Sequence, residues 1–440
     1  MSRQPHPFLW IPTLYLAEGI PYFIVNNISV LLFSQMGVSN GEMALFTSFL
    51  YLPWVLKPLW SPLVDLFGTK RRWIILTQII IAALLVLLTL SLPHPDTNII
   101  ASGKAPVSLF TVTLILFILT SFISATHDIS ADGFYMLALN GKQQAQYVGI
   151  RSLFFRLSNI FCNSLLVFIA GWLQKNGTSI PASWRMTLAC AAVLFTLLTL
   201  WHSRFLPFAE RDKSGDPGES GHSGISGQLH EFGRTFLTFF TKPHIIIALL
   251  FMLLFRLPEA FLLKLVPPFF TGECATGALG ISLVSYSFIY GIIGVCALLL
   301  GGIIGGLFAS WLGLRRSMWW MALAITLPNV VYLWLSLHPT QNIALISLAV
   351  GTEQFGYGFG FTAYMLYLMY FSQGEHQTSH YALCTGFMAL GMMLPGLVAG
   401  YLQEWVGYPV FFGIVMVFCL ITWLVTEMVR RTVDTQYGRK

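Results

Sequence analysis

Charged side chains are scarce in this sequence: Asp, Glu, Lys and Arg make up 10% of its 440 residues, whereas 56% are hydrophobic. A soluble globular domain carries about 25% charged residues, so the composition excludes that class. The formal net charge of +6 does not indicate nucleic-acid binding in so apolar a chain. We attribute it to basic loops that orient membrane helices, which predicts a lipid bilayer as the protein's surroundings.

Cysteine pairs and catalytic motifs are also missing. The six cysteines lie far apart, and none has the spacing of a metal site or a redox motif, so we expect no disulfide, metal or cofactor. The sequence contains no phosphate-binding loop and no paired His/Asp acyltransfer motif. We therefore predict that the protein is not an enzyme, although a polytopic acyl- or glycosyltransferase stays open as an alternative.

What the sequence does contain is a series of long apolar runs, each close to the roughly 20 residues that a membrane-spanning helix needs. The runs cover residues 8–35, 43–64, 73–92, 107–137, 146–171, 185–206, 244–270, 281–309, 316–337, 342–372, 380–402 and 408–429. They predict an all-α polytopic membrane protein with twelve transmembrane helices in two six-helix bundles. The polar insert 207–243, rich in Gly and Ser, predicts a cytoplasmic linker between bundles of residues 1–206 and 244–440.

The basic residues indicate how the helices are oriented. With a cytoplasmic N-terminus, sixteen of the 24 Lys and Arg residues fall on the cytoplasmic side and three fall outside. Because cytoplasmic loops are enriched in Lys and Arg, we predict that both termini are cytoplasmic. A basic cluster also recurs about half a chain apart, at residues 68–72 and 313–316, each time between two apolar runs. This recurrence predicts two related halves, the construction of transporters that alternate about a central site.

Residues 61–72 read SPLVDLFGTKRR and resemble the helix 2–3 loop motif of the major facilitator superfamily, loosely G-x-x-x-D-x-x-G-x-[RK]-[RK]. Residues 52–65, LPWVLKPLWSPLVD, and 125–133, ATHDISADG, are similar to stretches of its branch of AmpG-type muropeptide permeases and acetyl-CoA transporters. Residues 378–383, TSHYAL, resemble the start of that branch's eleventh span. Ser61 replaces the first glycine of the loop motif, and His127 stands where glutamine is usual.

This resemblance implies a secondary active transporter that imports an amino-sugar or muropeptide-like solute with protons, by alternating access, in a bacterial inner membrane. The implied partners are a small polar substrate, protons and the lipid bilayer, and we expect a monomer because the fold needs no oligomer. Other cargoes stay open. They are a nucleotide-linked acyl donor such as acyl-CoA, a simple oligosaccharide, or a drug exported by antiport.

Several charged residues fall near the middle of predicted spans. A helical rise of about 1.5 Å per residue places four of them near the midplane, and Glu259 slightly farther toward the outside. The four are Glu18, Arg156, Arg256 and Glu353. An ion facing lipid at this depth is costly, so these groups are predicted to face a central cavity or one another.

Glu18 is our first candidate for proton coupling. Gly19 and Pro21 follow it, and a helix kink is therefore expected beside its carboxylate. A carboxylate held there could bind a proton in one state and release it in another. The alternative is that Glu18 forms a permanent salt bridge to a neighbouring arginine. Glu353, which is followed by three nearby glycines, is the second coupling candidate.

Charges near the predicted cytoplasmic ends of spans are candidates for gating. Asp65 can stabilise closure against the N-terminus of the eleventh span, whose free amides attract a carboxylate, or it can pair with Arg71. Asp128 and Asp132 stand four residues apart, and a salt bridge to Arg151 at a gate is favoured for them. Asp128 is also the third candidate for proton coupling. The other gating candidates are Arg71, Arg72 and Lys57.

Residues in the middle of the spans are candidates for substrate binding. Arg156, Asn159 and Asn163 recur at i, i+3 and i+7, which gives one polar stripe. Arg156 and Arg256 suit an anionic or strongly hydrogen-bonding solute, unless Arg156 only neutralises Glu18 or Asp128. A local pair between Glu259 and Arg256 is favoured by their spacing of three. The remaining candidates are Asn26 for hydrogen bonding and Tyr22 for stacking on a sugar ring.

Overall fold

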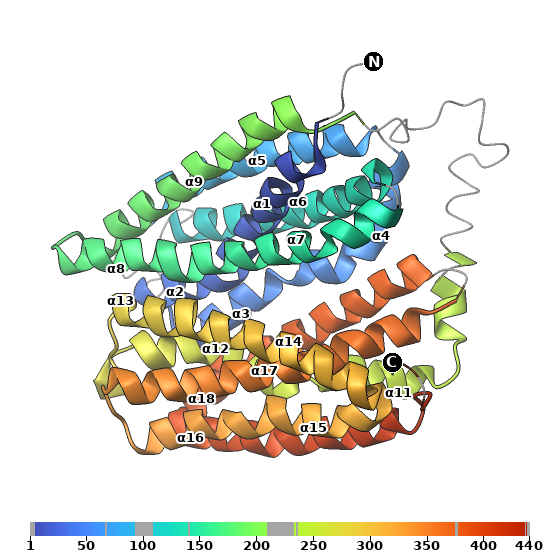
Figure 1. Cartoon of the computed structure of the whole chain (residues 1–440). Coiled ribbons are helices and arrows are strands. Elements are labelled where there is room, and N and C mark those ends of the chain that lie inside the picture. Colours follow the sequence, from blue (N-terminus) through green and yellow to red (C-terminus); the bar gives the residue numbers. More distant parts are fainter. Residues whose placement is uncertain are drawn as a thin grey trace. The chain divides into compact units, whose positions relative to one another are not determined.

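Every element that the structure describes is a helix, in agreement with the predicted all-α class. The computed structural model describes residues 5–66, 68–92, 109–139, 141–208, 233–234, 236–374, 377–435 and 437. Most of the predicted linker 207–243 therefore lies outside the described residues. The helices form two units, one of Met1–Leu32 with Leu56–Phe232 and one of Phe33–Val55 with Gly233–Lys440. Figure 1 shows the helices coloured along the sequence.

The first unit is built from helices of the N-terminal half of the sequence. They are η1 (Pro7–Leu9), α1 (Ile11–Phe23), η2 (Ile24–Ile28), α2 (Ser29–Gln35, shared with the second unit), α4 (Leu52–Leu66, also shared), α5 (Lys70–Ser91), α6 (Leu109–Ala138), α7 (Gly141–Ile160), η3 (Phe161–Leu166), α8 (Val167–Lys175) and α9 (Ile180–Phe205). Helix α5 packs between α6 and α9, and α1 packs on α6 and α7. This packing places α1, α6 and α7 around one interior.

The second unit contains the C-terminal helices together with one helix from the N-terminal half. They are α3 (Asn40–Phe49), α11 (Ile245–Leu254), α12 (Leu257–Thr271), η4 (Cys274–Thr276), α13 (Leu283–Tyr286), η5 (Ser287–Gly294), α14 (Val295–Leu312), α15 (Leu314–Thr326), η6 (Leu327–Asn329), α16 (Val330–Leu337), α17 (Ile343–Ser372) and α18 (Gln377–Arg430). Helix α17 packs against α14 and α15, while α18 packs against α3, α11 and α12.

The observed helices cover the twelve predicted ranges to within a few residues, with two differences. The range 43–64 is divided into α3 and α4, because Leu50 and Tyr51 form a turn. The ranges 380–402 and 408–429 lie in one long helix, α18, which Gly407 interrupts with a φ of 75° that favours glycine. Among the described residues, nine helices are long and apolar enough to cross a membrane. The boundary between two six-helix bundles stays a prediction.

Helix starts follow the local sequence. The Thr69 hydroxyl accepts a hydrogen bond from the Arg72 amide and begins α5, as the Ser39 hydroxyl does for α3 through the Glu42 amide. The basic turn at residues 68–72 therefore ends one helix and caps the next, as predicted. Gly68 has a φ of 83° in this turn, a backbone conformation that few other residues adopt easily.

Three helices contain a π-helical segment with one extra residue per turn. They are η2 after α1, η3 after α7, and η5 after α13. Such segments are uncommon in proteins and occur frequently at functional sites. Within the first unit, η2 and η3 contact each other, so the two irregular turns lie side by side.

Candidate functional site

The first unit contains a cluster of charged side chains contributed by α1, α4, α6 and α7. Lys57 on α4 forms an ion pair with Asp128 on α6. Arg151 Nη2 on α7 lies 2.5 Å from Asp132 Oδ1, and the Tyr15 hydroxyl donates to the same oxygen at 3.2 Å. The pairing of Arg151 with Asp132 is the one that the sequence favoured, and Lys57 is the additional partner.

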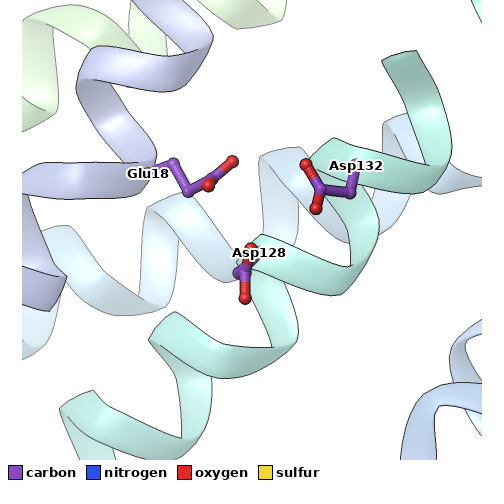
Figure 2. A group of neighbouring side chains, drawn as sticks. All are labelled: Glu18, Asp128 and Asp132. Carbon is purple, nitrogen blue, oxygen red and sulfur yellow. The ribbon is translucent and has the colours of Figure 1, made fainter. Parts of the chain in front are cut away.

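Glu18 lies beside these two ion pairs. Its side chain is only 7% exposed, and its Oε2 atom is buried without a hydrogen bond. Ligand oxygens of Glu18, Asp128 and Asp132 lie within 4.8 Å of one another, and Figure 2 shows the Glu18 carboxylate directed toward the two aspartates on α6. No salt bridge to Glu18 is found among the described residues, and the coupling role of Glu18 and its alternative both stay predictions.

The charges of this cluster do not balance. Three carboxylates face two cations, Lys57 and Arg151, so one negative charge is left over when all five groups are ionised. Carboxylates this close repel each other, and one bound proton on Glu18 removes the excess. A metal ion would need the oxygens of Asp128 and Asp132, which are already engaged by the two cationic side chains. The arrangement therefore suits a proton better than a metal.

A buried hydrogen-bonded chain lies next to the cluster. Gln78 Nε2 is 2.9 Å from His127 Nε2, and Gln78 Oε1 is 3.0 Å from His202 Nδ1. The second ring nitrogen of His202 is 3.0 Å from the Thr13 hydroxyl. These contacts join α5, α6, α9 and α1. His127 is thus a hydrogen-bonded residue inside the helix packing.

The π-helical segments η2 and η3 bring together amide side chains. Asn27 Nδ2 donates to Asn163 Oδ1 at 3.4 Å, and Asn163 donates in turn to Asn159. Asn26 donates to the Tyr22 carbonyl at 3.1 Å, while its own Oδ1 is buried without a partner. The polar stripe predicted along α7 and η3 is therefore extended to η2, and it offers both donors and acceptors for hydrogen bonding.

In the second unit, Arg256 and Glu259 form the local pair that their spacing predicted. Arg256 Nη2 lies 2.6 Å from Glu259 Oε1, and its Nε donates to the other carboxylate oxygen at 2.8 Å. The same Nη2 donates to the Tyr357 hydroxyl at 2.9 Å. The guanidinium also lies 4.8 Å from the centroid of the Phe361 ring. Glu259 is thereby fixed in orientation by a two-pronged contact.

Glu353 on α17 lies in a different environment, surrounded by neutral donors. It is 7% exposed, and its Oε2 accepts from the Tyr332 hydroxyl and from Gln354 Nε2, each at 2.8 Å. Gln354 Nε2 also contacts the Tyr290 hydroxyl at 3.2 Å, and the Tyr290 ring stacks on Tyr286 at 5.5 Å. Tyr286 ends α13, and Tyr290 lies in η5, which follows it directly.

The contacts of the remaining predicted residues are described one by one. Arg71 Nε donates to the Leu206 carbonyl at 3.0 Å, and its guanidinium lies over the Phe208 ring. Arg72 is exposed at the start of α5. Arg156 is half-buried on α7. The side chain of Asp65 lies outside the described residues, so its predicted gating contact stays a prediction.

Sequence reasoning missed two groups of residues around these clusters. Tyr332 and Gln354 hold Glu353, Tyr290 contacts Gln354, and only their presence in apolar runs could have pointed to them. Lys264 is not among the predicted site residues, although a lysine in the middle of an apolar run is itself a signal. It is buried on α12.

Comparisons with known proteins extend over most of the chain. The sequence profile of the Major Facilitator Superfamily matches residues 13–378. A protein of Rickettsia conorii named AmpG 4 is 23% identical over 417 residues, 92% of each chain. An Escherichia coli K12 protein named anhydromuropeptide permease is 23% identical over 93% of this chain and 77% of its own. The structure of a D-xylose-proton symporter has a TM-score of 0.71 at 12% identity and covers 98% of both chains.

Proposed function

We propose that this chain, which belongs to the major facilitator superfamily, imports an amino-sugar or muropeptide-like solute together with protons. The family membership makes it a multi-pass membrane transporter rather than an enzyme. Transport proceeds by alternating access, as in transporters built from two related halves. The family match agrees with the resemblance at residues 61–72, and the AmpG names of the relatives agree with the resemblance at 52–65 and 125–133.

The observation that carries the coupling proposal is the unmatched carboxylate of Glu18. In a cluster of three carboxylates and two cations, it alone lacks an ion pair, and its Oε2 has no hydrogen bond. A proton neutralises the cluster, and its release leaves a buried negative charge that favours another conformation. This chemistry therefore supports the proton as the coupled ion. Asp128 and Asp132 fix Lys57 and Arg151 in place beside Glu18 through their ion pairs.

The cargo proposal rests on the polar groups of the two units and on the relatives. The amides of Asn27, Asn159 and Asn163 can donate to and accept from the acetamido and hydroxyl groups of an amino sugar. In the second unit, the guanidinium of Arg256 is paired with Glu259 and can still donate hydrogen bonds to a polar group of a peptide-bearing sugar. The name of the Escherichia coli relative, anhydromuropeptide permease, points to the same class of solute.

A second cargo, a simple sugar, is favoured by one observation. The structure with a TM-score of 0.71 is that of a D-xylose-proton symporter, and it covers 98% of both chains. At 12% identity this likeness shows the fold, so the cargo itself has to be decided by binding. Under the same scheme the protein is a monomer in a bacterial inner membrane. Both of its termini lie in the cytoplasm, which is supported by the sixteen basic residues on that side against three outside.

The proposal is tested with purified protein in liposomes that carry an inward proton gradient. Wild-type protein concentrates a labelled anhydromuropeptide, whereas Glu18→Gln still exchanges labelled for unlabelled solute but no longer responds to the gradient. Glu427→Gln is the matched control, because Glu427 pairs with Arg430 and Arg431 near the end of α18 and should couple normally. Gradient-driven accumulation by Glu18→Gln at the wild-type level would falsify the assignment.

The cargo is identified by ligand-induced thermal stabilisation of the detergent-solubilised protein. A solute that binds the folded state raises the melting temperature by mass action. An anhydromuropeptide, chitobiose, D-xylose and an acyl-CoA are compared at equal concentration. A shift with the anhydromuropeptide or chitobiose supports the amino-sugar class, whereas a shift with D-xylose or the acyl-CoA alone contradicts it.

A further inference from the structure

Lys264 on α12 is a buried lysine that none of the sites above uses. Its side chain is 1% exposed. The ammonium nitrogen donates to the Thr47 hydroxyl on α3 at 3.1 Å and lies 5.0 Å from the centroid of the Tyr51 ring. Among the described residues, no carboxylate forms an ion pair with it. An ionisable group buried in a membrane span without a counter-charge is a functional residue by default.

The elements packed around Lys264 bring hydroxyl groups and no free carboxylate. On α12 itself, Arg256 and Glu259 neutralise each other. Helix α3 contributes the hydroxyls of Thr47 and Ser48, both fully buried, and the Ser48 hydroxyl has no hydrogen-bond partner. Thr47 already donates to the Met43 carbonyl, so toward Lys264 its oxygen can only accept.

Helix α18 and the ends of α3 do not supply the missing charge either. Gly396 on α18 faces Lys264, and a Cβ atom there would lie 3.5 Å from Lys264 Cε. The carboxylate of Glu404, farther along α18, accepts a hydrogen bond from the Gly41 amide at 2.7 Å. Glu42 lies in the first turn of α3, five residues before Thr47. An uncharged amine therefore fits this packed environment better than an ammonium does.

The contact that buries Lys264 is formed where α3 packs on α12 and α18, and these helices can separate. Helix α3 belongs to a predicted span whose other part, α4, lies in the first unit from Leu56 onward, and the turn at Leu50 and Tyr51 divides the two helices. Polar contacts hold α3 on α18, among them Asn40 Nδ2 to Gln403 Oε1 at 2.7 Å. With cytoplasmic termini, α3 lies at the outer end of its span, where alternating access requires this contact to break.

We propose that Lys264 is a second proton-exchanging residue of the transport cycle, protonated when α3 stands away from α12 and α18 and neutral when α3 packs on them. This inference rests on the alternating access proposed above. When α3 departs, water reaches the amine and stabilises its charge. When α3 returns, the proton leaves with the water, so closure of the outer contact is linked to proton release.

The test measures the distance between α3 and α18 in lipid nanodiscs as the pH changes. Spin labels are attached to cysteines at Glu42 and Trp405, the latter 84% exposed on α18, after the six native cysteines have been replaced. In wild-type protein the long-distance population grows as the pH falls. For one linked proton, the ratio of the two populations changes by at most about tenfold per pH unit.

Two variants of Lys264 should respond in opposite directions. Lys264→Met has a similar length without charge and should keep the short distance at every pH. Lys264→Arg keeps its charge throughout and should favour the long distance at every pH. The control Lys175→Met, at an exposed position at the end of α8, should follow the wild type. Lys264→Gln replaces the Met variant if that one does not give a monodisperse, cooperatively melting protein.

The outcomes separate this inference from the proposed coupling at Glu18. A pH response that persists in Glu18→Gln and disappears in Lys264→Met supports the inference. It is overturned if the Met variant responds as the wild type does, if Met and Arg shift the distance in the same direction, or if one distance holds at every pH. Failure of the coupling proposal is seen elsewhere, as normal gradient-driven uptake by Glu18→Gln.

Discussion

The buried carboxylates of the two units have different partners. In the first unit, three carboxylates compete for two cations, and Glu18 is left without a partner. In the second unit, Glu259 has Arg256 to itself, and Glu353 accepts hydrogen bonds from two neutral donors. A carboxylate with partners is held in place, whereas one without partners must change its charge or its surroundings. We infer a division of labour in which Glu18 of the first unit exchanges the proton that is coupled to uptake, whereas Glu259 and Glu353 of the second unit keep their charge.

The largest expected effect is a difference between two equivalent substitutions. Glu18→Gln should lower gradient-driven uptake about a hundredfold, the upper range of coupling between two sites. Glu353→Gln should lower it far less, because glutamine can still accept from Tyr332 and Gln354. The measurement is initial uptake into liposomes with and without a proton gradient. Equal losses in the two variants would remove the division of labour between the units.

A large effect on stability is expected from removing one cation of the first unit. Lys57→Met leaves Asp128 with no counter-charge and adds a second unmatched carboxylate beside Glu18. We expect a loss of about 2 kcal/mol in unfolding free energy, less than for a fully buried pair because both groups are partly exposed. Denaturant unfolding in detergent measures it. Combining Lys57→Met with Asp128→Asn should restore most of the loss, and no recovery would contradict the pairing.

A smaller effect is expected on solute binding in the second unit. Arg256→Lys removes the two-pronged contact with Glu259 and the contact with the Tyr357 hydroxyl, although it keeps the charge. Affinity for the solute should fall about tenfold, since a lysine amine cannot reproduce the planar fork. Isothermal titration calorimetry measures the affinity. Proton coupling should stay normal in this variant, and its loss would show that Arg256 takes part in coupling as well.

The smallest effect is expected at the end of α18. Glu427 pairs with Arg430 and Arg431, and it accepts from Trp319 Nε1 at 2.7 Å. Glu427→Gln keeps the tryptophan contact and loses exposed ion pairs, which are worth about 0.5 kcal/mol. A small drop in melting temperature with unchanged uptake is the expected result. A strong loss of uptake would show that charge balance matters outside the two clusters.

Contacts between residues close in sequence were predictable, and some of those between distant helices were not. The spacing of three between Arg256 and Glu259 fixes a shared helix face, and the structure confirms their pair. The pair of Lys57 and Asp128, 71 residues apart, depends on how two helices are rotated about their axes. Helices that are apolar on every side carry little information about that rotation.

The sequence also did not predict that the second span is divided into two helices. Residues 43–64 form one continuous apolar run, yet Leu50 and Tyr51 form a turn in it, and α3 packs with helices of the other half. Tertiary contacts there outweigh local helix preference. The same contacts bury Lys264 against Thr47. The sequence therefore indicated that Lys264 is an unusual residue, but it did not indicate Thr47 as its contact.

The closeness of α3 and α18 has a practical consequence. At Gly400 the two main chains touch, and a methyl group in place of a hydrogen atom would lie 1.9 Å from the Asn40 carbonyl oxygen. Alanine at this position would act as a wedge between the helices. One added carbon atom thus offers a tool for trapping the opposite conformer for crystallisation or for raising state-selective antibodies.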